Sequence, residues 1–174
     1  MRFVKILIKC QCWRIVFFNL HFQTKNNLTL QNIIDFHFLP EELNALCTKI
    51  NPESKKVCNS TMKIKKESVI VKNTVIVCQL KIFHYDTIGG SKKINYNMSD
   101  LLKDNKVTIN NTKFNIKCVI FHLGDSVNSG HYISLIRNTN NSWTEVNDDQ
   151  VISNCVSINN IGQPYLIFLE KDHH

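Results

Sequence analysis

A succession of short β-type runs separated by polar turns constrains the fold of this chain more than any other feature. From residue 62 onward, Val, Ile and aromatic residues alternate with polar ones, as they do in strands with one buried face. After the alternating stretch at 62–85, the runs are KVTIN, KFNIKCVIFHL, HYISLIR, WTEVND and PYLIFLEK. Short turns favour antiparallel neighbours, so we expect the C-terminal two-thirds to form an antiparallel meander.

Polar interruptions divide the region that precedes these runs. We expect residues 62–85 to contain two strands, with the break near Lys72 and Asn73. Residues 87–100, TIGGSKKINYNMSD, are expected to form a loop that pivots at Gly89 and Gly90, because glycines punctuate regular structure.

The N-terminal third mixes strand and helix patterns. Residues 3–22 predict two short strands around a CQC turn, because their apolar residues are mostly aromatic or β-branched. The stretch LQNIIDFHF has apolar residues at helical spacing, and Pro40 is placed to open a second helical turn in PEELNALC. Together the patterns predict an α+β fold.

The composition limits the class of protein and its surroundings. A chain of 174 residues with 43% hydrophobic and 20% charged residues suits one globular domain. The net charge of +7 comes from small lysine clusters without a nucleic-acid-binding motif, so we interpret it as a solvated surface and expect no nucleic-acid partner. Seven cysteines, an odd number, indicate a reducing compartment, the cytoplasm or the nucleus. No uninterrupted apolar run reaches about 18 residues, so we expect no membrane partner.

A histidine and a distant polar partner stand out around the HYISLIR run. His131 begins an expected strand, and Gly130 before it permits an unusual backbone conformation and the close approach of another segment. A turn at NTNNS would bring Asn147 back alongside His131, with Asp148 next to it. A histidine that acts as a general base needs a partner for its second ring nitrogen, and an Asn or Asp oxygen fixes its tautomer. The pattern therefore fits a base and its orienting partner.

Each of these residues has a plainer interpretation when taken alone. A histidine at the start of a strand is most often a surface or structural residue, and an Asn-Asp-Asp cluster is usually a turn. Trp143 is most simply a core residue. A β-rich domain of unrelated function therefore stays open on these residues, and only their order and spacing favour a site.

The segment from Phe114 to Leu169 resembles the C-terminal portion of the catalytic domain of ubiquitin-specific proteases. Their histidine box has the form Y-x-L-x-A-V-x-x-H-x-G-x-x-x-x-G-H-Y, followed by W-x-x-F-N/D-D and a terminal Y-L-L-F-Y strand. This chain has FNIKCVIFHLGDSVNSGHY, WTEVNDD and PYLIFLE in the same order. Upstream, Leu80, Lys81 and Phe83 match the family pattern P-x-x-L-x-x-x-L-K-R-F, which precedes a mobile loop.

The resemblance implies a fold and a division of the chain. It implies the α+β fold of the papain-like cysteine-protease superfamily, mainly the antiparallel β palm and the β fingers, with one or two short helices. The helical thumb of the family is missing from the matched part. We expect one partial domain over 1–174, with a fingers-like region over about 1–72 and the palm with the histidine box over about 73–172.

The resemblance also implies roles for the residues around the histidine. His131 matches the general base, Asn147 the residue that orients it, and Asp148 an auxiliary acidic residue. Gly130 and Tyr132 match the substrate-binding residues that flank the base, where the glycine leaves a narrow passage for the Gly-Gly tail of ubiquitin. The nucleophile of the family lies in a G-N-T-C-Y-x-N-S motif. This chain has no GNTC, so no nucleophile is assigned.

Many members of the family hold zinc between two C-x-x-C pairs on the β fingers, where four thiolates surround the ion. Here Cys10 and Cys12 are one residue too close together, and Cys58 stands without a paired cysteine. These three residues form at most a degenerate zinc ribbon. We therefore expect no bound zinc and no other cofactor.

Two functions follow as expectations from the resemblance. The first is a deubiquitinating cysteine protease domain of the ubiquitin carboxyl-terminal hydrolase type, which is a fragment or inactive alone because it lacks the nucleophile box. The alternative is a catalytically dead pseudo-deubiquitinase that binds ubiquitin or another protein. In both cases the expected partners are ubiquitin or ubiquitinated proteins. Without the thumb, one sheet face would be exposed, and we expect association through that face.

Overall fold

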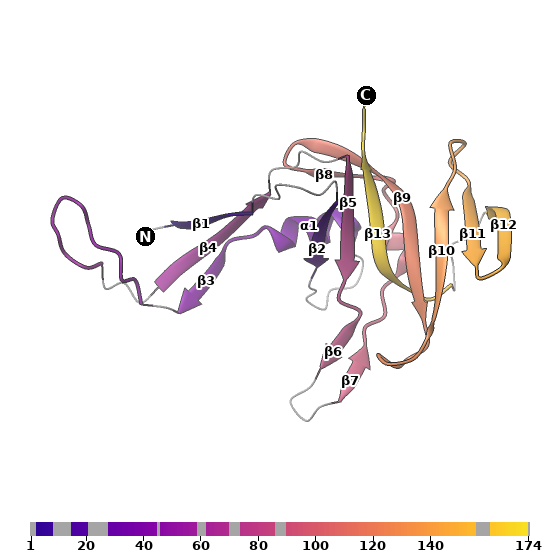
Figure 1. The fold of residues 1–174 in the computed structure, drawn as a ribbon, viewed down its shortest axis with the longest axis horizontal. Coiled ribbons are helices and arrows are strands. Elements are labelled where there is room, and N and C mark those ends of the chain that lie inside the picture. The colour runs from indigo at the N-terminus through magenta and orange to yellow at the C-terminus, as the bar shows by residue number, and fades with distance from the viewer. Residues whose placement is uncertain are drawn as a thin grey trace.

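The computed structural model describes the chain in eight segments, and these contain thirteen strands and two helices in three sheets (Figure 1). The described residues are 3–8, 15–20, 28–44, 46–58, 62–69, 74–85, 90–155 and 161–173. Within these segments, neither helix has the length and apolar character needed to cross a lipid bilayer.

The largest sheet contains eight of the described strands and carries most of the core. Its members are β2 (Ile15–Leu20), β5 (Val75–Leu80), β8 (Lys106–Ile109), β9 (Thr112–Leu123), β10 (His131–Arg137), β11 (Trp143–Asn147), β12 (Gln150–Cys155) and β13 (Gln163–Lys171). The strand order is β12-β11-β10-β9-β13-β5-β2, and β8 pairs with β9 beside this path. All pairs are antiparallel except the parallel pair of β2 and β5.

The expected meander is confirmed for four consecutive strands and is wrong for the last one. Strands β9 to β12 follow one another in the sheet as short antiparallel turns predict. Strand β13 does not extend the edge beyond β12 but lies between β9 and β5. Its Ile167 and Leu169 are fully buried in the core cluster that contains residues of α1.

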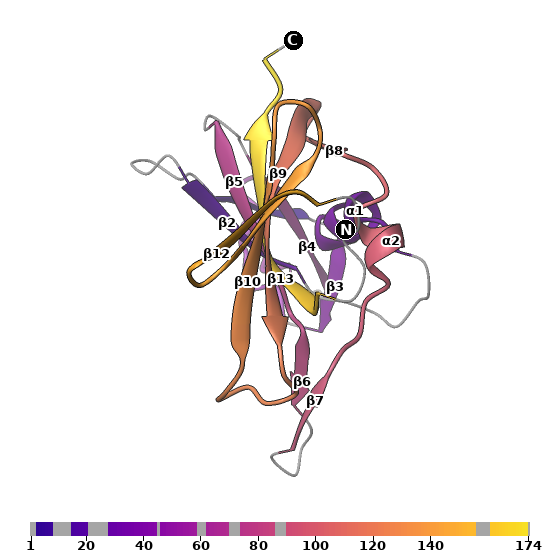
Figure 2. The same cartoon turned by 90° about the vertical axis from the view of Figure 1, so that its right-hand side faces the viewer.

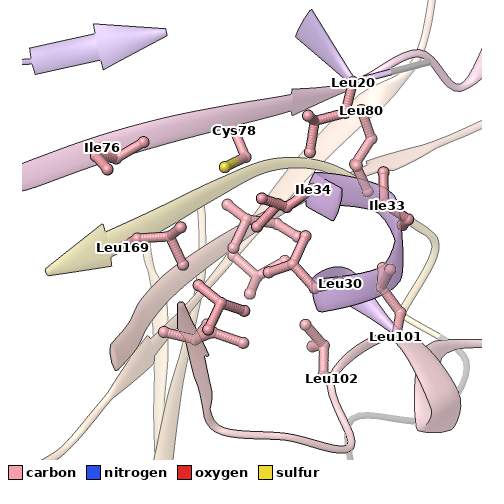
Figure 3. Packing of buried hydrophobic residues seen from close by; sticks show 14 of the residues in the cluster. Leu20, Leu30, Ile33, Ile34, Ile76, Cys78, Leu80, Leu101, Leu102 and Leu169 are labelled. Atoms are coloured by element: carbon pink, nitrogen blue, oxygen red, sulfur yellow. The ribbon is translucent and has the colours of Figure 1, made fainter. Parts of the chain in front are cut away.

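Helix α1 (Leu30–His37) covers the core side of this sheet, where the helical spacing of LQNIIDFHF predicted a helix. A capping box begins it, because the Thr29 hydroxyl accepts from the Asn32 backbone N–H at 3.2 Å and the Asn32 side chain accepts from the Thr29 N–H. Leu30, Ile33 and Ile34 point into the core together with residues of the sheet (Figure 3). Each such buried side chain contributes about 1.5–3 kcal/mol.

A smaller sheet contains β1 (Phe3–Ile8), β4 (Met62–Val69) and β3 (Glu41–Asn44), in the order β1-β4-β3. Strand β3 corrects the second helical turn expected in PEELNALC. Its residues pair antiparallel with β4, from Glu41 opposite Lys65 to Asn44 opposite Met62. This pairing satisfies the strand backbone, and the weak helical preference of four residues after Pro40 does not outweigh it.

The expected loop at 87–100 is also partly wrong, because its described part contains regular structure. Strands β6 (Phe83–Tyr85) and β7 (Ser91–Lys93) form an antiparallel hairpin, and helix α2 (Met98–Leu101) follows it. Residues 86–89, including the expected pivot Gly89, lie outside the described residues. Leu101 and Leu102 are buried against the core, so this segment is held by packing. Figure 2 shows α1 and α2 on the same side of the large sheet.

The break expected near Lys72 and Asn73 falls between β4 and β5, although both residues lie outside the described ones. The two strands belong to different sheets. The division into fingers and palm stays a prediction, and β2 from the first region pairs with β5 from the second.

Candidate active site

The register of β10 and β11 places the expected base and its partner on one face of the sheet. His131 begins β10, and the pairing of Ser134 with Val146 puts Asn147, the last residue of β11, diagonally across from it. Side chains alternate along a strand, so both lie on the face of the buried Leu135. We call this the core face. Diagonal neighbours are within reach of long side chains.

The two side chains meet in a short hydrogen bond. His131 Nε2 lies 2.6 Å from Asn147 Oδ1. An amide oxygen only accepts, so this contact requires a proton on Nε2. In the neutral imidazole the lone pair is then on Nδ1, free to take a proton from another group. The expected pair is therefore brought together in the geometry that a general base needs.

Asp148 lies next to this pair but is mostly in solvent. Its Oδ2 is 3.9 Å from His131 Nε2, and its side chain is 79% exposed. With Asp149 it forms the two-residue turn between β11 and β12, where its positive φ of 50° is a conformation that Asp tolerates. Solvent screening leaves such a carboxylate a small electrostatic effect on the imidazole.

A glycine is needed at position 130 because there is no room for a side chain, and not because of its backbone conformation. The left-handed glycines in the described residues are Gly124 and Gly162, so the unusual conformation expected for Gly130 is wrong. A Cβ at this position would instead overlap His122 Nε2 and lie 2.5 Å from the Leu123 carbonyl oxygen. The expected close approach is present, and the approaching segment is the end of β9.

The opposite face of β10 carries a group of aromatic side chains. Tyr132 alternates with His131, so it projects from this face, which we call the outer face and define by Tyr132, Ile136 and Val151. The Tyr132 ring is half-exposed and lies 5.1 Å from the His122 ring and 6.0 Å from that of Tyr165.

The site residues predicted from the sequence around His131 did not include His122. It is 2% exposed, and its Nδ1 has no hydrogen-bond partner in the described part of the chain. Burial, reinforced by the charge of Lys93, lowers the pKa of His122 below its ordinary value, so it is a neutral packing group beside Gly130. The signal for it was present, because His122 matches the first histidine of the H-x-G part of the quoted box.

The cysteines of the large sheet lie far from His131. Cys155 pairs with Trp143, and Trp143 pairs with Arg137 at the other end of β10. At 3.3 Å per residue, Arg137 is about 20 Å along the strand from His131. Cys118 lies five residues before the β9 residue that faces His131, about 17 Å along the strand. Burial also raises the pKa of the Cys118 thiol.

The other described cysteines also lie away from His131. Cys78 is on β5, three strands from β10 or about 14 Å, and burial raises its pKa to about 12. Cys47 is buried and Cys58 is exposed. Both belong to the segment 46–58, which lies beside the small sheet at the other end of the molecule from β10 (Figure 1). None of these described thiols is placed to donate its proton to His131.

The described residues contain no group of three or more His, Cys, Asp or Glu side chains arranged to hold a metal ion. Of the three cysteines considered for a degenerate zinc ribbon, Cys10 and Cys12 lie outside the described residues. Cys58 is exposed, with a free thiol.

Comparison with solved structures supports the fold. The chain is similar to the SAGA DUB module of Ubp8, Sgf11, Sus1 and Sgf73 bound to monoubiquitin, with 22% identity and a TM-score of 0.64, over 90% of this chain and 35% of that one. The same module bound to ubiquitin aldehyde has 21% sequence identity and a TM-score of 0.60, over 90% of this chain and 36% of that one. The yeast module with an Sgf73 mutant has 24% sequence identity and a TM-score of 0.58, over 90% of this chain and 35% of that one. The chain thus spans about a third of the length of the structures it matches, and its mainly antiparallel sheet with two described helices confirms the expected fold class.

A family model gives the assignment. No curated protein matches the sequence. The model described as ubiquitin carboxyl-terminal hydrolase matches residues 12–168, which include nearly the whole large sheet and both residues of the His131–Asn147 pair. The expected resemblance is therefore confirmed, and the chain belongs to the ubiquitin carboxyl-terminal hydrolase family.

Proposed function

We propose that this chain carries the general-base side of a thiol protease that cleaves after the C-terminal glycine of ubiquitin. The observation that carries the proposal is the 2.6 Å contact between His131 Nε2 and Asn147 Oδ1. Family membership supplies the substrate class, and two of the solved modules described above are bound to monoubiquitin or ubiquitin aldehyde. The activity is proposed for an assembly that includes a nucleophilic thiol from outside the described residues.

The chemistry assigned to each residue follows from its position. Nδ1 of His131 takes the proton of the attacking thiol, and the thiolate adds to the carbonyl carbon of the scissile bond. Asn147 then holds the imidazolium that forms, because its Oδ1 still accepts from Nε2–H. The imidazolium returns its proton to the leaving amine, and water attacks the acyl-enzyme with the same imidazole as base.

The second candidate is a module that binds ubiquitin without cleaving it. The placement of the described cysteines favours it, since none lies next to His131. The resemblance assigns recognition of the Gly-Gly tail to Gly130 and Tyr132, which flank His131, and the Tyr132 side chain is half-exposed. In either case the free cysteines of the described residues fit a reducing compartment, and we propose the cytoplasm or the nucleus.

A ubiquitin probe with a C-terminal electrophile tests the proposal. For the chain alone we expect no covalent adduct, and saturable binding of unmodified ubiquitin by titration. Ubiquitin that lacks its last two glycines is the matched control and should bind more weakly. When a family segment with the Cys box is added, we expect an adduct that His131→Ala abolishes.

The possible outcomes separate the candidates. An adduct on a cysteine of this chain would refute the assignment of the nucleophile to another segment. Binding that persists with no adduct after the Cys box is supplied would favour the binding module. Failure to bind either form of ubiquitin and to react would refute both candidates.

A further inference from the structure

A lysine from the β6–β7 hairpin reaches the end of β9, just before the loop that leads to His131. Lys93 Nζ donates to the His122 carbonyl oxygen at 3.1 Å and also to the carbonyl oxygen of Gly124. We propose that Lys93 is a positioning residue for His131 and that it acts through the loop 124–130. The inference rests on the proposed role of His131 as the base.

The loop 124–130 has little to hold it apart from its ends. All seven of its residues are exposed, and none of them belongs to a strand or a helix. Its internal contact is a hydrogen bond from the Asn128 N–H to Ser126 Oγ at 3.1 Å. An exposed segment of this kind opens more readily than the strands that flank it. The placement of its two ends therefore decides where β10 begins.

The two ends of the loop touch each other. A Cβ on Gly124 would lie 3.4 Å from the Gly130 Cα, which is ordinary contact distance, so the glycines pack together. Gly130 in turn rests on the His122 ring and precedes His131 directly. Holding Gly124 therefore holds Gly130, and holding Gly130 sets the position of the base.

Lys93 acts where three parts of the fold meet. His122 is the second-last residue of β9, and its carbonyl oxygen accepts from Lys93 of β7. The same oxygen lies 2.9 Å from where a Cβ of Gly162, just before β13, would be. An ammonium group has three donors, and here it donates to the carbonyl oxygens of His122, in β9, and of Gly124, the first residue of the loop. Such charge-assisted bonds are stronger than neutral ones. One cation thus ties the hairpin, the end of β9 and the loop together.

Precise placement matters for a general base. A misplacement of about 1 Å at a catalytic group lowers a rate by about 100-fold. The His131–Asn147 bond fixes which nitrogen is free, but it leaves the ring able to shift with its backbone. Lys93 restricts that backbone through the carbonyl oxygens of His122 and Gly124.

Amide hydrogen exchange in the full chain tests this role without requiring activity. Lys93→Met is the main variant, Lys93→Arg the conservative one, and Lys92→Met the matched control, since Lys92 is the exposed neighbour on the same strand. In Lys93→Met we expect exchange at 130–133 to accelerate by about 10- to 100-fold, as loss of a charge-assisted bond implies. Exchange in β5 and β13 should not change. Lys93→Arg should restore most of the protection.

A second readout follows the imidazole of His131 by its ring nitrogen resonances. In Lys93→Met we expect these resonances to broaden or split, while the spectra of the Lys92→Met and Lys93→Arg variants match that of the unmodified chain. The inference would be overturned if Lys93→Met and the unmodified chain exchange at the same rate at 130–133 and show the same His131 resonances. Acceleration spread evenly over β5 and β13 would also overturn it, because that indicates global destabilisation. Neither result depends on ubiquitin binding, so the proposed function could fail separately.

Discussion

Replacing Asn147 by alanine should change which nitrogen of His131 carries the proton. The side chain of Asn147 supplies the acceptor that Nε2–H faces at 2.6 Å, in a partly buried position. A net hydrogen bond of this kind contributes about 0.5–1.5 kcal/mol, which corresponds to roughly a 2- to 13-fold change in the ratio of the two neutral tautomers. Asn147→Ala should therefore shift the population away from the Nε2–H form by that factor.

Long-range correlation spectra of the histidine ring nitrogens measure this ratio directly, at about pH 8, where an ordinary imidazole is neutral. The matched control is Asn138→Ala, at the opposite end of the same hairpin. Asn138 Nδ2 donates to Ser142 Oγ at 2.8 Å and to Thr144 Oγ1 at 3.1 Å, so this variant loses side-chain bonds without touching His131. An unchanged tautomer ratio in Asn147→Ala, or an equal change in Asn138→Ala, would refute the orienting role.

Four further predictions follow from the packing and the charges. Gly130→Ala should destabilise the fold by about 1–3 kcal/mol in urea unfolding, because its Cβ would overlap the His122 ring; a variant of full stability would contradict this. The lowered pKa of His122 means that the unfolded state takes up a proton that the folded state resists, so stability falls as pH drops below the ordinary value of 6.5. His122→Phe should reduce that fall between pH 7 and 5.5, and parallel pH curves would count against the assignment. In the native chain, an alkylating reagent should modify the exposed Cys58 long before the buried Cys78, as peptide mass spectrometry would detect. Through its outer face the isolated chain should associate, and a monodisperse monomer in light scattering would argue otherwise.

The sequence was most informative where pattern and topology agree. The alternation in KFNIKCVIFHL and HYISLIR placed β9 and β10, and the short turn after them placed β11. This was enough to bring Asn147 alongside His131, as the 2.6 Å contact shows. The short turn between two neighbouring strands was therefore enough to predict that His131 and Asn147 lie side by side, without knowledge of the long-range strand pairing.

Long-range pairing was beyond the sequence pattern. The run PYLIFLEK reads as a strand, but nothing in it says that it pairs with β5 and β9 and not with β12. Strand β3 was missed for the same reason, because four residues after Pro40 take their conformation from β4. The contact of Lys93 with the end of β9 joins segments 29 residues apart, and only the fold brings them together.

The two faces of the sheet contribute differently to the candidate site, and we expect them to control different properties of His131. On the core face, Asn147 determines which nitrogen of His131 is protonated, because an amide oxygen can only accept. On the outer face, His122 fills the space beside Gly130. The role that we propose for Lys93 is to hold the loop that enters β10 through the carbonyl oxygens of His122 and Gly124. A change on the core face should alter which nitrogen of the imidazole is protonated, while the position of the ring stays the same. A change on the outer face should alter the position and leave the tautomer preference, because the bond to Asn147 persists wherever the ring still reaches it.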